Sequence, residues 1–166
     1  MLQRVVLGLG SNIGDRRKYI TDSVKILSLR RNFLFIGISD IYESEPWGFK
    51  NQNNFLNCAV VFLYRSGPGT LLTEIKEVEK TTGRTAREKW HPREIDIDVL
   101  FFGNKVLKKR NLMIPHPQIE YRNFVLAPLA QLMPFYIHPS AGKTIIELFE
   151  TSTDSGRVLS LLSCKK

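Results

Sequence analysis

The spacing of apolar residues predicts strands and helices in alternation along the chain. Apolar runs at 5–9, 33–44 and 55–64 have the composition of strands. Apolar residues recur at helical spacing after Asp15 and across 70–82, with Gly83 in position to end the second helix. Two more helices are indicated at 122–132 and 145–149. Helices therefore follow the first and third of these strands.

The segment 95–102 is the most informative strand, because it alternates apolar and acidic residues before becoming wholly apolar. Side chains at positions i and i+2 of a strand share a face, so Asp96 and Asp98 point the same way. Two carboxylates about 7 Å apart along a strand repel each other unless a cation lies between them. Mg²⁺ fits, because it prefers carboxylate oxygens and takes its other ligands from water and phosphate. The alternative is a pair of solvated side chains on an edge strand.

The order of these elements is β-α-β-β-α-β, followed by two further helices. This order predicts an α+β, ferredoxin-like fold. We expect an antiparallel sheet with helices packed on one face and extra C-terminal helices. The loops after the second and third strands, together with the strand 95–102, would then supply the binding residues.

Length and composition predict one soluble domain spanning residues 1–166. The 166 residues are 43% hydrophobic and 24% charged, as in ordinary globular proteins. No 18-residue apolar run predicts a membrane span, and the N-terminus lacks the layout of a signal peptide. The two cysteines, Cys58 and Cys164, suggest no disulfide framework, so a cytoplasmic location is expected.

The formal net charge of +8 favours an anionic partner. Clusters of basic residues at 16–18 and 108–110 are more typical of solvated surface than of a binding groove. Arg87 and Arg93 lie just upstream of the acidic strand, and the candidates for holding phosphate are Arg84, Arg87, Arg93, His116 and Arg122.

A second group of side chains is suited to an aromatic ring. Asn57 lies inside an apolar strand, and its amide offers both donors and an acceptor to a flat heterocycle or to a neighbouring loop. Trp47, Phe55 and Phe124 supply ring faces. Paired carboxylates with a surplus of arginines suit phosphoryl transfer. Together these residues indicate a magnesium-dependent transferase that uses a nucleoside triphosphate.

Several motifs resemble those of the 6-hydroxymethyl-7,8-dihydropterin pyrophosphokinases of folate biosynthesis, nearly end to end. The matching segments are Gly-Leu-Gly-Ser-Asn at 8–12, Tyr-Glu-Ser-Glu-Pro-Trp-Gly at 42–48, Phe-Leu-Asn at 55–57, Gly-Arg at 83–84, Trp-His-Pro-Arg at 90–93, Ile-Asp-Ile-Asp at 95–98 and Ile-Pro-His at 114–116. The long run from Trp90 to Asp98 is far more specific than an isolated Asp-x-Asp.

The resemblance implies a reaction and its participants. ATP would donate its β,γ-pyrophosphate to the hydroxymethyl group of the reduced pterin, and AMP would leave. Two Mg²⁺ ions would be held by Asp96 and Asp98, with Arg93 and Arg87 completing the catalytic group. The pterin would be bound by Ser44, Glu45, Pro46, Trp47, Gly48, Phe55, Asn57 and Phe124. ATP would be bound by Lys76, Glu79, Arg84, Arg87, Trp90, Arg93, Val99, Leu112, His116 and Arg122.

The resemblance also implies that loops 11–16, 45–54 and 84–93 open and close. Neither nucleic acid nor membrane is an expected partner, whereas neighbouring folate-pathway enzymes are candidates. The chain departs from the family pattern at Ala86, where a second arginine is usual, and Arg87 is the candidate replacement. Phe55 stands in place of a common tyrosine and keeps the ring face.

Two other classes of protein fit part of the pattern. Metal-dependent nucleotidyl transferases and nucleases also place paired aspartates on such a sheet, but they need an extended basic groove. RNA-recognition domains share the β-α-β-β-α-β order, but their characteristic aromatic run does not occur in this sequence.

Overall fold

The computed structural model describes residues 2–86 and 91–161. Its elements in chain order are β1 (Gln3–Ser11), α1 (Arg16–Leu29), β2 (Phe33–Ile38), β3 (Ile41–Ser44), β4 (Phe55–Tyr64), α2 (Pro68–Thr81), β5 (Asp96–Phe102), β6 (Leu107–Lys109), β7 (Leu112–Ile114), the 3₁₀ helix η1 (Ile119–Tyr121), α3 (Asn123–Leu132), α4 (Ile145–Glu150) and β8 (Val158–Leu161). The predicted ferredoxin-like α+β fold is confirmed.

The main sheet is antiparallel and runs in the order β5-β1-β4-β3-β8, with β2 also paired to β4. β1 therefore lies between β4 and β5, and β6 and β7 form a separate hairpin. The order places the N-terminal strand between two strands that arrive much later in the chain. Residues far apart in sequence consequently meet across β1.

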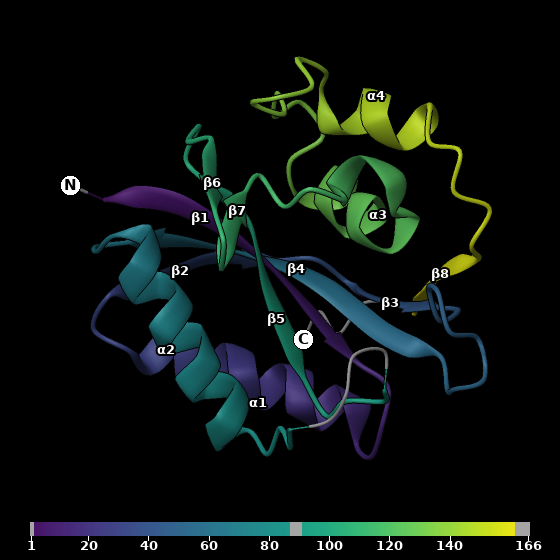
Figure 1. Cartoon of the computed structure of the whole chain (residues 1–166), viewed down its shortest axis with the longest axis horizontal. Coiled ribbons are helices and arrows are strands. Elements are labelled where there is room, and N and C mark those ends of the chain that lie inside the picture. The colour runs from purple at the N-terminus through teal and green to yellow at the C-terminus, as the bar shows by residue number, and fades with distance from the viewer. Residues whose placement is uncertain (1, 87–90, 162–166) are drawn as a thin grey trace.

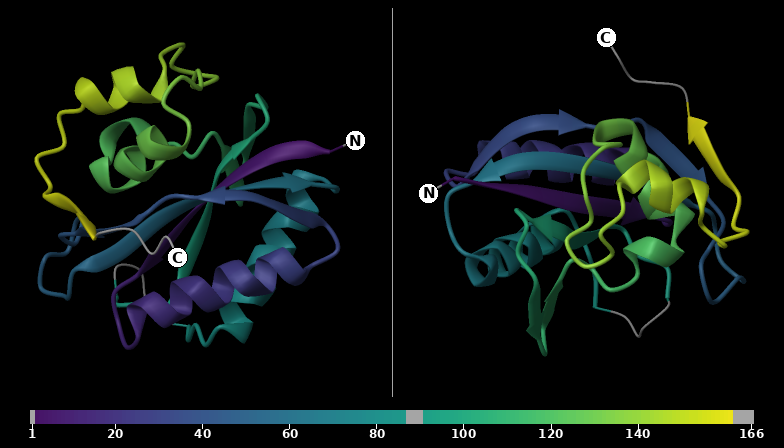
Figure 2. Two further views of the ribbon diagram at one scale, coloured as in Figure 1. Left: turned by 180° about the vertical axis from the view of Figure 1, so that it is seen from behind. Right: turned by 90° about the horizontal axis from the view of Figure 1, so that it is seen from above.

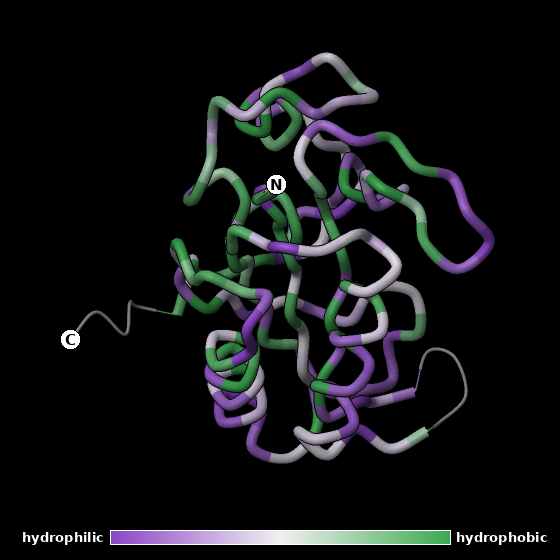
Figure 3. Tube along the Cα trace, turned by 90° about the vertical axis from the view of Figure 1, so that its left-hand side faces the viewer, coloured by the Kyte–Doolittle hydropathy of each residue, from purple (hydrophilic) through white to green (hydrophobic). Residues whose placement is uncertain are grey.

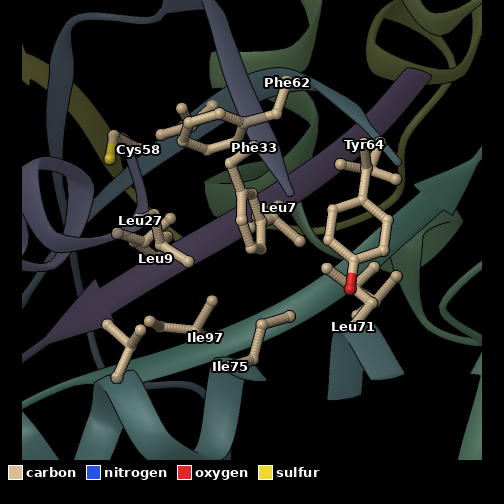
Figure 4. Close-up of a cluster of buried hydrophobic side chains, with 14 of the residues drawn as sticks. Leu7, Leu9, Leu27, Phe33, Cys58, Phe62, Tyr64, Leu71, Ile75 and Ile97 are labelled. Atoms are coloured by element: carbon tan, nitrogen blue, oxygen red, sulfur yellow. The ribbon is translucent and has the colours of Figure 1, made fainter. Parts of the chain in front are cut away.

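Helices cover both faces of this sheet, as Figure 1 shows. Alternate residues of β1 point to opposite faces: Leu7 and Leu9 pack under α1 and α2, whereas Val6 packs under α3 and α4. Figure 4 shows Leu7 and Leu9 facing Leu27 of α1 and Ile75 of α2. The expectation of helices on one face therefore holds for the first two helices but is corrected for the C-terminal pair.

The helix boundaries follow the local chemistry of their ends. The Asp15 carboxylate accepts a hydrogen bond from the backbone N–H of Lys18 at 3.0 Å and caps α1, as predicted. α2 begins at Pro68, because proline is tolerated in the first helical turn. Gly83 follows α2 with φ of +107°, a conformation that glycine adopts readily. The helical turns carry both hydrophobic and hydrophilic residues along the trace in Figure 3.

Two strand predictions require correction. The expected single strand 33–44 is divided into β2 and β3, because Ser39 breaks the regular ladder: its hydroxyl accepts the N–H of Ala59 at 3.0 Å. The C-terminal strand β8 was not predicted, and it pairs with β3 from Val158 opposite Ser44 to Leu161 opposite Ile41. β8 has only four residues, too few to show an alternation of apolar and polar side chains in the sequence. It forms a strand because the edge of β3 is available for pairing.

Among residues 2–86 and 91–161, none of the helices combines the length and apolar character that crossing a bilayer requires. Cys58 is buried as a free thiol, and burial raises its pKa to about 12. The thiol therefore stays protonated and unreactive at neutral pH.

Candidate functional site

A cavity of about 460 Å³ opens on the face of the sheet beside α3. It brings together residues from the four strands β1, β3, β4 and β5, from three loops and from α3. Its lining includes Gly8, Gly10, Ser44, Glu45, Trp47, Gln52, Phe55, Asn57, Arg93, Asp96, Asp98, Leu100, His116, Gln118, Arg122 and Phe124. Arg93, His116 and Arg122 of the predicted phosphate side therefore share one hollow with the predicted ring-binding side, whereas Lys76, Glu79 and Arg84 are not among its lining residues.

Strand register explains why these two groups meet. Gly10 of β1 lies opposite Asn57 of β4 on one side and opposite Asp96 of β5 on the other. A Cβ atom at position 10 would come within 3.3 Å of Asn57 Oδ1 and 3.8 Å of Phe55 Cδ1. Gly8 repeats the arrangement opposite Asp98. Because Gly8 and Gly10 have no side chains, the cavity extends over β1 and leaves room there for a ligand.

Asp96 is held by two arginines from different segments. The Arg84 guanidinium lies 2.6 Å from Asp96 Oδ1, and Arg93 pairs with Oδ2 of the same carboxylate. Burial opposes ionisation of Asp96, but the charges of Arg93 and Arg84 outweigh it and lower the pKa of the carboxyl. Asp96 is therefore an anion that already has cationic partners.

The pKa of Asp98 shifts in the opposite direction to that of Asp96. Burial and the neighbouring charge of Asp96 raise the pKa of Asp98 to about 6. Ile97 and Val99 pack into the core on the other face, so both carboxylates point into the cavity, as the strand pattern predicted.

The carboxylate pair fits a magnesium ion. Two carboxylates on one face of β5 suit a hard dication such as Mg²⁺. Arginines neutralise the charge of Asp96, whereas the raised pKa of Asp98 shows that its charge is not fully neutralised by its surroundings. Over the part of the chain that the structure describes, no cluster of three or more His, Cys, Asp or Glu side chains forms a complete cage. Mg²⁺ takes water and phosphate oxygens among its ligands, so the carboxylate pair would supply only part of its coordination.

Glu79 anchors the arginine side of the site from α2. Its nearly buried carboxylate accepts hydrogen bonds from the backbone N–H of Ile97 at 2.8 Å, from Lys76 at 2.8 Å and from Arg84 at 2.5 Å. Arg84 therefore bridges Glu79 and Asp96. The bridge connects the end of α2 to the acidic strand β5 and fixes where the Arg84 charge lies.

The other end of the cavity carries the amide and the aromatic rings. Asn57 is buried, and its Nδ2 donates to the hydroxyl of Ser44 at 2.9 Å. The rings of Phe55, Phe124 and Trp47 line the same end. Because Ser44 fixes the amide, Asn57 can present a defined polar edge to a planar ligand between aromatic faces.

Arg122 and His116 lie between these two ends. Burial lowers the pKa of Arg122, but the group remains a cation at neutral pH, and its guanidinium carbon lies 4.3 Å from the centre of the Trp47 ring. Burial and the charge of Arg122 lower the pKa of His116 to about 4. His116 is therefore neutral at pH 7 and offers hydrogen bonds without adding charge.

The remaining candidate residues are placed differently. Val99 packs in the core on the far face of β5, and Leu112 lies on β7 against that core, so neither side chain lines the cavity. Pro46 and Gly48 flank the lining residue Trp47. Arg87 and Trp90 lie outside the described residues.

Asn12 is a structural residue that inspection of single motifs missed. It is fully buried; its Oδ1 accepts the Arg93 N–H at 2.8 Å, and its Nδ2 donates to Gln52 Oε1 at 2.9 Å. Asn12 therefore ties the loop after β1 to the two loops that flank the cavity. The sequence signals were the Gly-Leu-Gly-Ser-Asn motif at 8–12, which ends in Asn12, and the polar pair Ser11-Asn12 directly after an apolar run.

Comparisons with known proteins agree with this geometry. Residues 6–134 match the family model of 7,8-dihydro-6-hydroxymethylpterin-pyrophosphokinase. A 2-amino-4-hydroxy-6-hydroxymethyldihydropteridine pyrophosphokinase of Aquifex aeolicus is 45% identical over 150 residues, which cover 90% of this chain and 92% of that protein. A similarly named protein of Synechocystis is 38% identical over 145 residues, covering 87% and 74%.

Among solved structures, a Plasmodium falciparum HPPK-DHPS variant superposes with a TM-score of 0.71 at 17% identity. The match covers 90% of this chain but only 43% of that longer one, and at this identity it shows the fold. The family match spans most of the chain, and the Aquifex relative is matched over almost its full length. This chain therefore belongs to the 7,8-dihydro-6-hydroxymethylpterin-pyrophosphokinase family.

Proposed function

We propose that the chain transfers the β,γ-pyrophosphate of ATP to the hydroxymethyl group of 6-hydroxymethyl-7,8-dihydropterin and releases AMP. Family membership supports the reaction. The observation that carries the assignment to this site is the juxtaposition of an acidic–basic end and an amide–aromatic end in one cavity, on either side of Gly10.

In this proposal Asn57 and Ser44 bind the polar edge of the pterin, and Phe55 and Phe124 hold its ring faces. The hydroxymethyl oxygen then lies toward Asp96 and Asp98. This oxygen attacks the β-phosphorus and its proton is released to water, while the bond from the β-phosphorus to the oxygen of the α-phosphate breaks and AMP leaves with that oxygen. Positioning and charge neutralisation supply most of the catalysis in such transfers.

Arg84, Arg93 and Arg122 are the cations placed to hold the triphosphate. Arg93 lines the cavity beside Asp96 and would contact phosphate oxygens, whereas Arg84, held between Glu79 and Asp96, would add positive charge behind them. His116 stays neutral because of its low pKa and can donate a hydrogen bond. Arg87 and Trp90 remain predicted ATP contacts.

We further propose that Asp96 and Asp98 hold Mg²⁺. When bound, the metal would neutralise phosphate charge and shield the two carboxylates from each other. A nuclease would leave the Asn57 and aromatic end without a role, and in an RNA-recognition domain Asp96 and Asp98 would repel phosphate unless a metal were bound. A role beside neighbouring folate-pathway enzymes is also consistent with the two-part name of the Plasmodium relative.

Product analysis tests the proposal directly. The full chain is mixed with ATP, Mg²⁺ and the hydroxymethyl dihydropterin, and nucleotides are separated by chromatography. AMP should form in amounts equal to pyrophosphorylated pterin, and chelation by EDTA should stop it. Formation of ADP, or hydrolysis of ATP without pterin, would contradict the pyrophosphate transfer, whereas full activity in EDTA would contradict only the metal.

A further inference from the structure

The segment 151–157 links α4 to β8 and is bonded to two elements that border the cavity. In the left-hand view of Figure 2, this yellow segment passes outside α3 and descends to β8. Asp154 within it binds the first residue of α3. At its end, the carbonyl of Arg157 accepts the N–H of Glu45 at 3.4 Å, and Val158 of β8 pairs with Ser44. The segment therefore connects the helix on one side of the cavity to β3 on the other.

Asp154 holds Asn123, the first residue of α3, by two hydrogen bonds. Its Oδ2 accepts the backbone N–H of Asn123 at 2.8 Å, and its backbone carbonyl accepts the side-chain Nδ2–H of Asn123, also at 2.8 Å. The other carboxylate oxygen, Oδ1, accepts the N–H of Gly156 at 2.9 Å. The N–H of Asp154 donates to Ser152 Oγ at 3.2 Å. The carboxylate is thus fixed both within its own segment and on the helix.

The Asp154 carboxylate takes the place of an N-cap side chain for α3. The first N–H groups of a helix lack acceptors inside the helix, and a carboxylate beside them also interacts favourably with the helix dipole. The residue that precedes α3 is Arg122, whose side chain has donors only and cannot accept such a bond. The start of α3 is therefore capped by a residue 31 positions later in the chain.

The start of α3 carries one of the two phenylalanine rings of the aromatic end of the cavity. Phe124 follows Asn123 directly in the first turn of α3, whereas Phe55 lies on β4 opposite Ser44. One ring thus belongs to a helix and the other to the sheet. The gap between the rings consequently depends on where α3 begins above the sheet, and Asp154 fixes that beginning.

We propose that Asp154 is a positioning residue for pterin binding, because it holds the start of α3 so that Phe124 faces Phe55 across the width of a planar ring. This inference rests on the proposed function, which takes the ligand between the two phenylalanines to be the pterin. Residues 151–157 are all described, and none of them lines the cavity. Asp154 therefore acts through α3 and does not touch the ligand. A pocket that is already ordered binds more tightly, because binding no longer has to order it.

Pterin titration of Asp154→Ala by calorimetry tests this role. The affinity for 6-hydroxymethyl-7,8-dihydropterin should fall about three- to tenfold, since binding must then order the start of α3. Asp154→Asn should give a smaller loss, because its amide oxygen can still accept the Asn123 N–H. It also provides the measurement if Asp154→Ala does not fold. Thermal unfolding shows which variants fold.

Asp40→Ala is the matched control for a general loosening of α3. The Asp40 carboxylate is also half-buried, and it accepts a hydrogen bond from Nε2 of Gln131 at 2.7 Å, near the other end of the same helix. Asp40→Ala should therefore lower the unfolding temperature but keep the wild-type pterin affinity. An equal loss of pterin affinity in Asp40→Ala and Asp154→Ala would overturn the inference.

A double-mutant cycle with Phe124 tests whether Asp154 acts through this ring. In a Phe124→Ala background, Asp154→Ala should weaken pterin binding by less than about twofold more, because the ring that it positions is already missing. The full loss in that background would overturn the inference. Unchanged pterin affinity in both Asp154 variants would overturn it too, while leaving the pyrophosphate transfer intact. A wild-type chain that binds no pterin and forms no AMP would instead contradict the proposed function, and this inference with it.

Discussion

The guanidinium of Arg122 stacks on the ring of Trp47, with its central carbon 4.3 Å from the ring centre. The same guanidinium lies 5.6 Å from the Phe124 ring. Arg122 is a proposed phosphate ligand, and Trp47 belongs to the loop between β3 and β4. The stack therefore links the proposed nucleotide end of the cavity with the loop that borders the pterin end.

Trp47→Leu should weaken ATP binding by about two- to fivefold, the loss expected for one partly exposed cation–π contact. Trp47→Phe should retain most of the affinity, because a ring face remains. Isothermal titration with a non-hydrolysable ATP analogue measures both. Equal affinity for the wild-type protein and Trp47→Leu would show that the stack does not position Arg122 for the nucleotide.

Asp96→Asn and Asp98→Asn should each reduce magnesium-dependent AMP formation by about a thousandfold or more, because the removed carboxylate supplies several kcal/mol of charge stabilisation through the metal. Asp22→Asn is a suitable control, since Asp22 forms a surface ion pair with Lys18 on α1. Near-normal turnover by both site variants, with a folded circular dichroism spectrum, would exclude the metal assignment.

The same two variants should have opposite effects on the stability of the metal-free protein. The folded pKa of Asp98 is about 6, above the ordinary value of about 3.9, so the folded state holds this proton more tightly than the unfolded state. The stabilisation from this group is complete below about pH 4 and is lost as pH rises through about 6. Asp98→Asn should therefore increase the free energy of unfolding at pH 8 by about 1–2 kcal/mol, with the gain vanishing toward pH 4.

The pKa of Asp96 is lowered, so its ionised form stabilises the fold above its unfolded pKa and the contribution is lost as pH falls. Asp96→Asn should consequently destabilise the protein at pH 8, where it leaves Arg84 and Arg93 without their carboxylate partner. Urea denaturation in EDTA at both pH values measures the two effects. If both variants change the free energy of unfolding in the same direction at pH 8, the opposite pKa shifts assigned to Asp96 and Asp98 are wrong.

Asn57→Ala should weaken pterin binding by about ten- to a hundredfold, because the ligand edge and Ser44 lose a buried hydrogen-bond partner. Affinity for the ATP analogue should change far less, since Asn57 lies at the other end of the cavity. Calorimetry with each ligand separately gives the comparison. Equal losses for the two ligands would count against a pterin pocket at this end.

Gly10→Ala should reduce pterin affinity without a large loss of stability. The added methyl group would approach Asn57 Oδ1 to 3.3 Å and fill the floor of the cavity. Gly69→Ala is the matched control, because a Cβ atom there would meet no atom within 4 Å. Thermal unfolding and pterin titration of both variants separate the two effects, and unchanged pterin affinity in Gly10→Ala would place the ring elsewhere.

The sequence alone determined the local features of this protein. The two-residue period of 95–102 was sufficient to place Asp96 and Asp98 on one face, because side chains alternate along any strand. Helical periodicity and the Asp15 cap located α1 and α2 in the same way. These features depend on near neighbours in the chain, so the pattern of residues specifies them directly.

Only the tertiary structure decided which distant residues meet. Gly10 lies between Asn57 and Asp96, and Arg84 reaches Asp96 from the end of α2, because β1 inserts between β4 and β5 with a fixed register. The division of 33–44 at Ser39 and the pairing of β8 likewise depend on contacts with other strands. Register is set by packing and hydrogen bonding between segments far apart in sequence, and local periodicity carries no record of it.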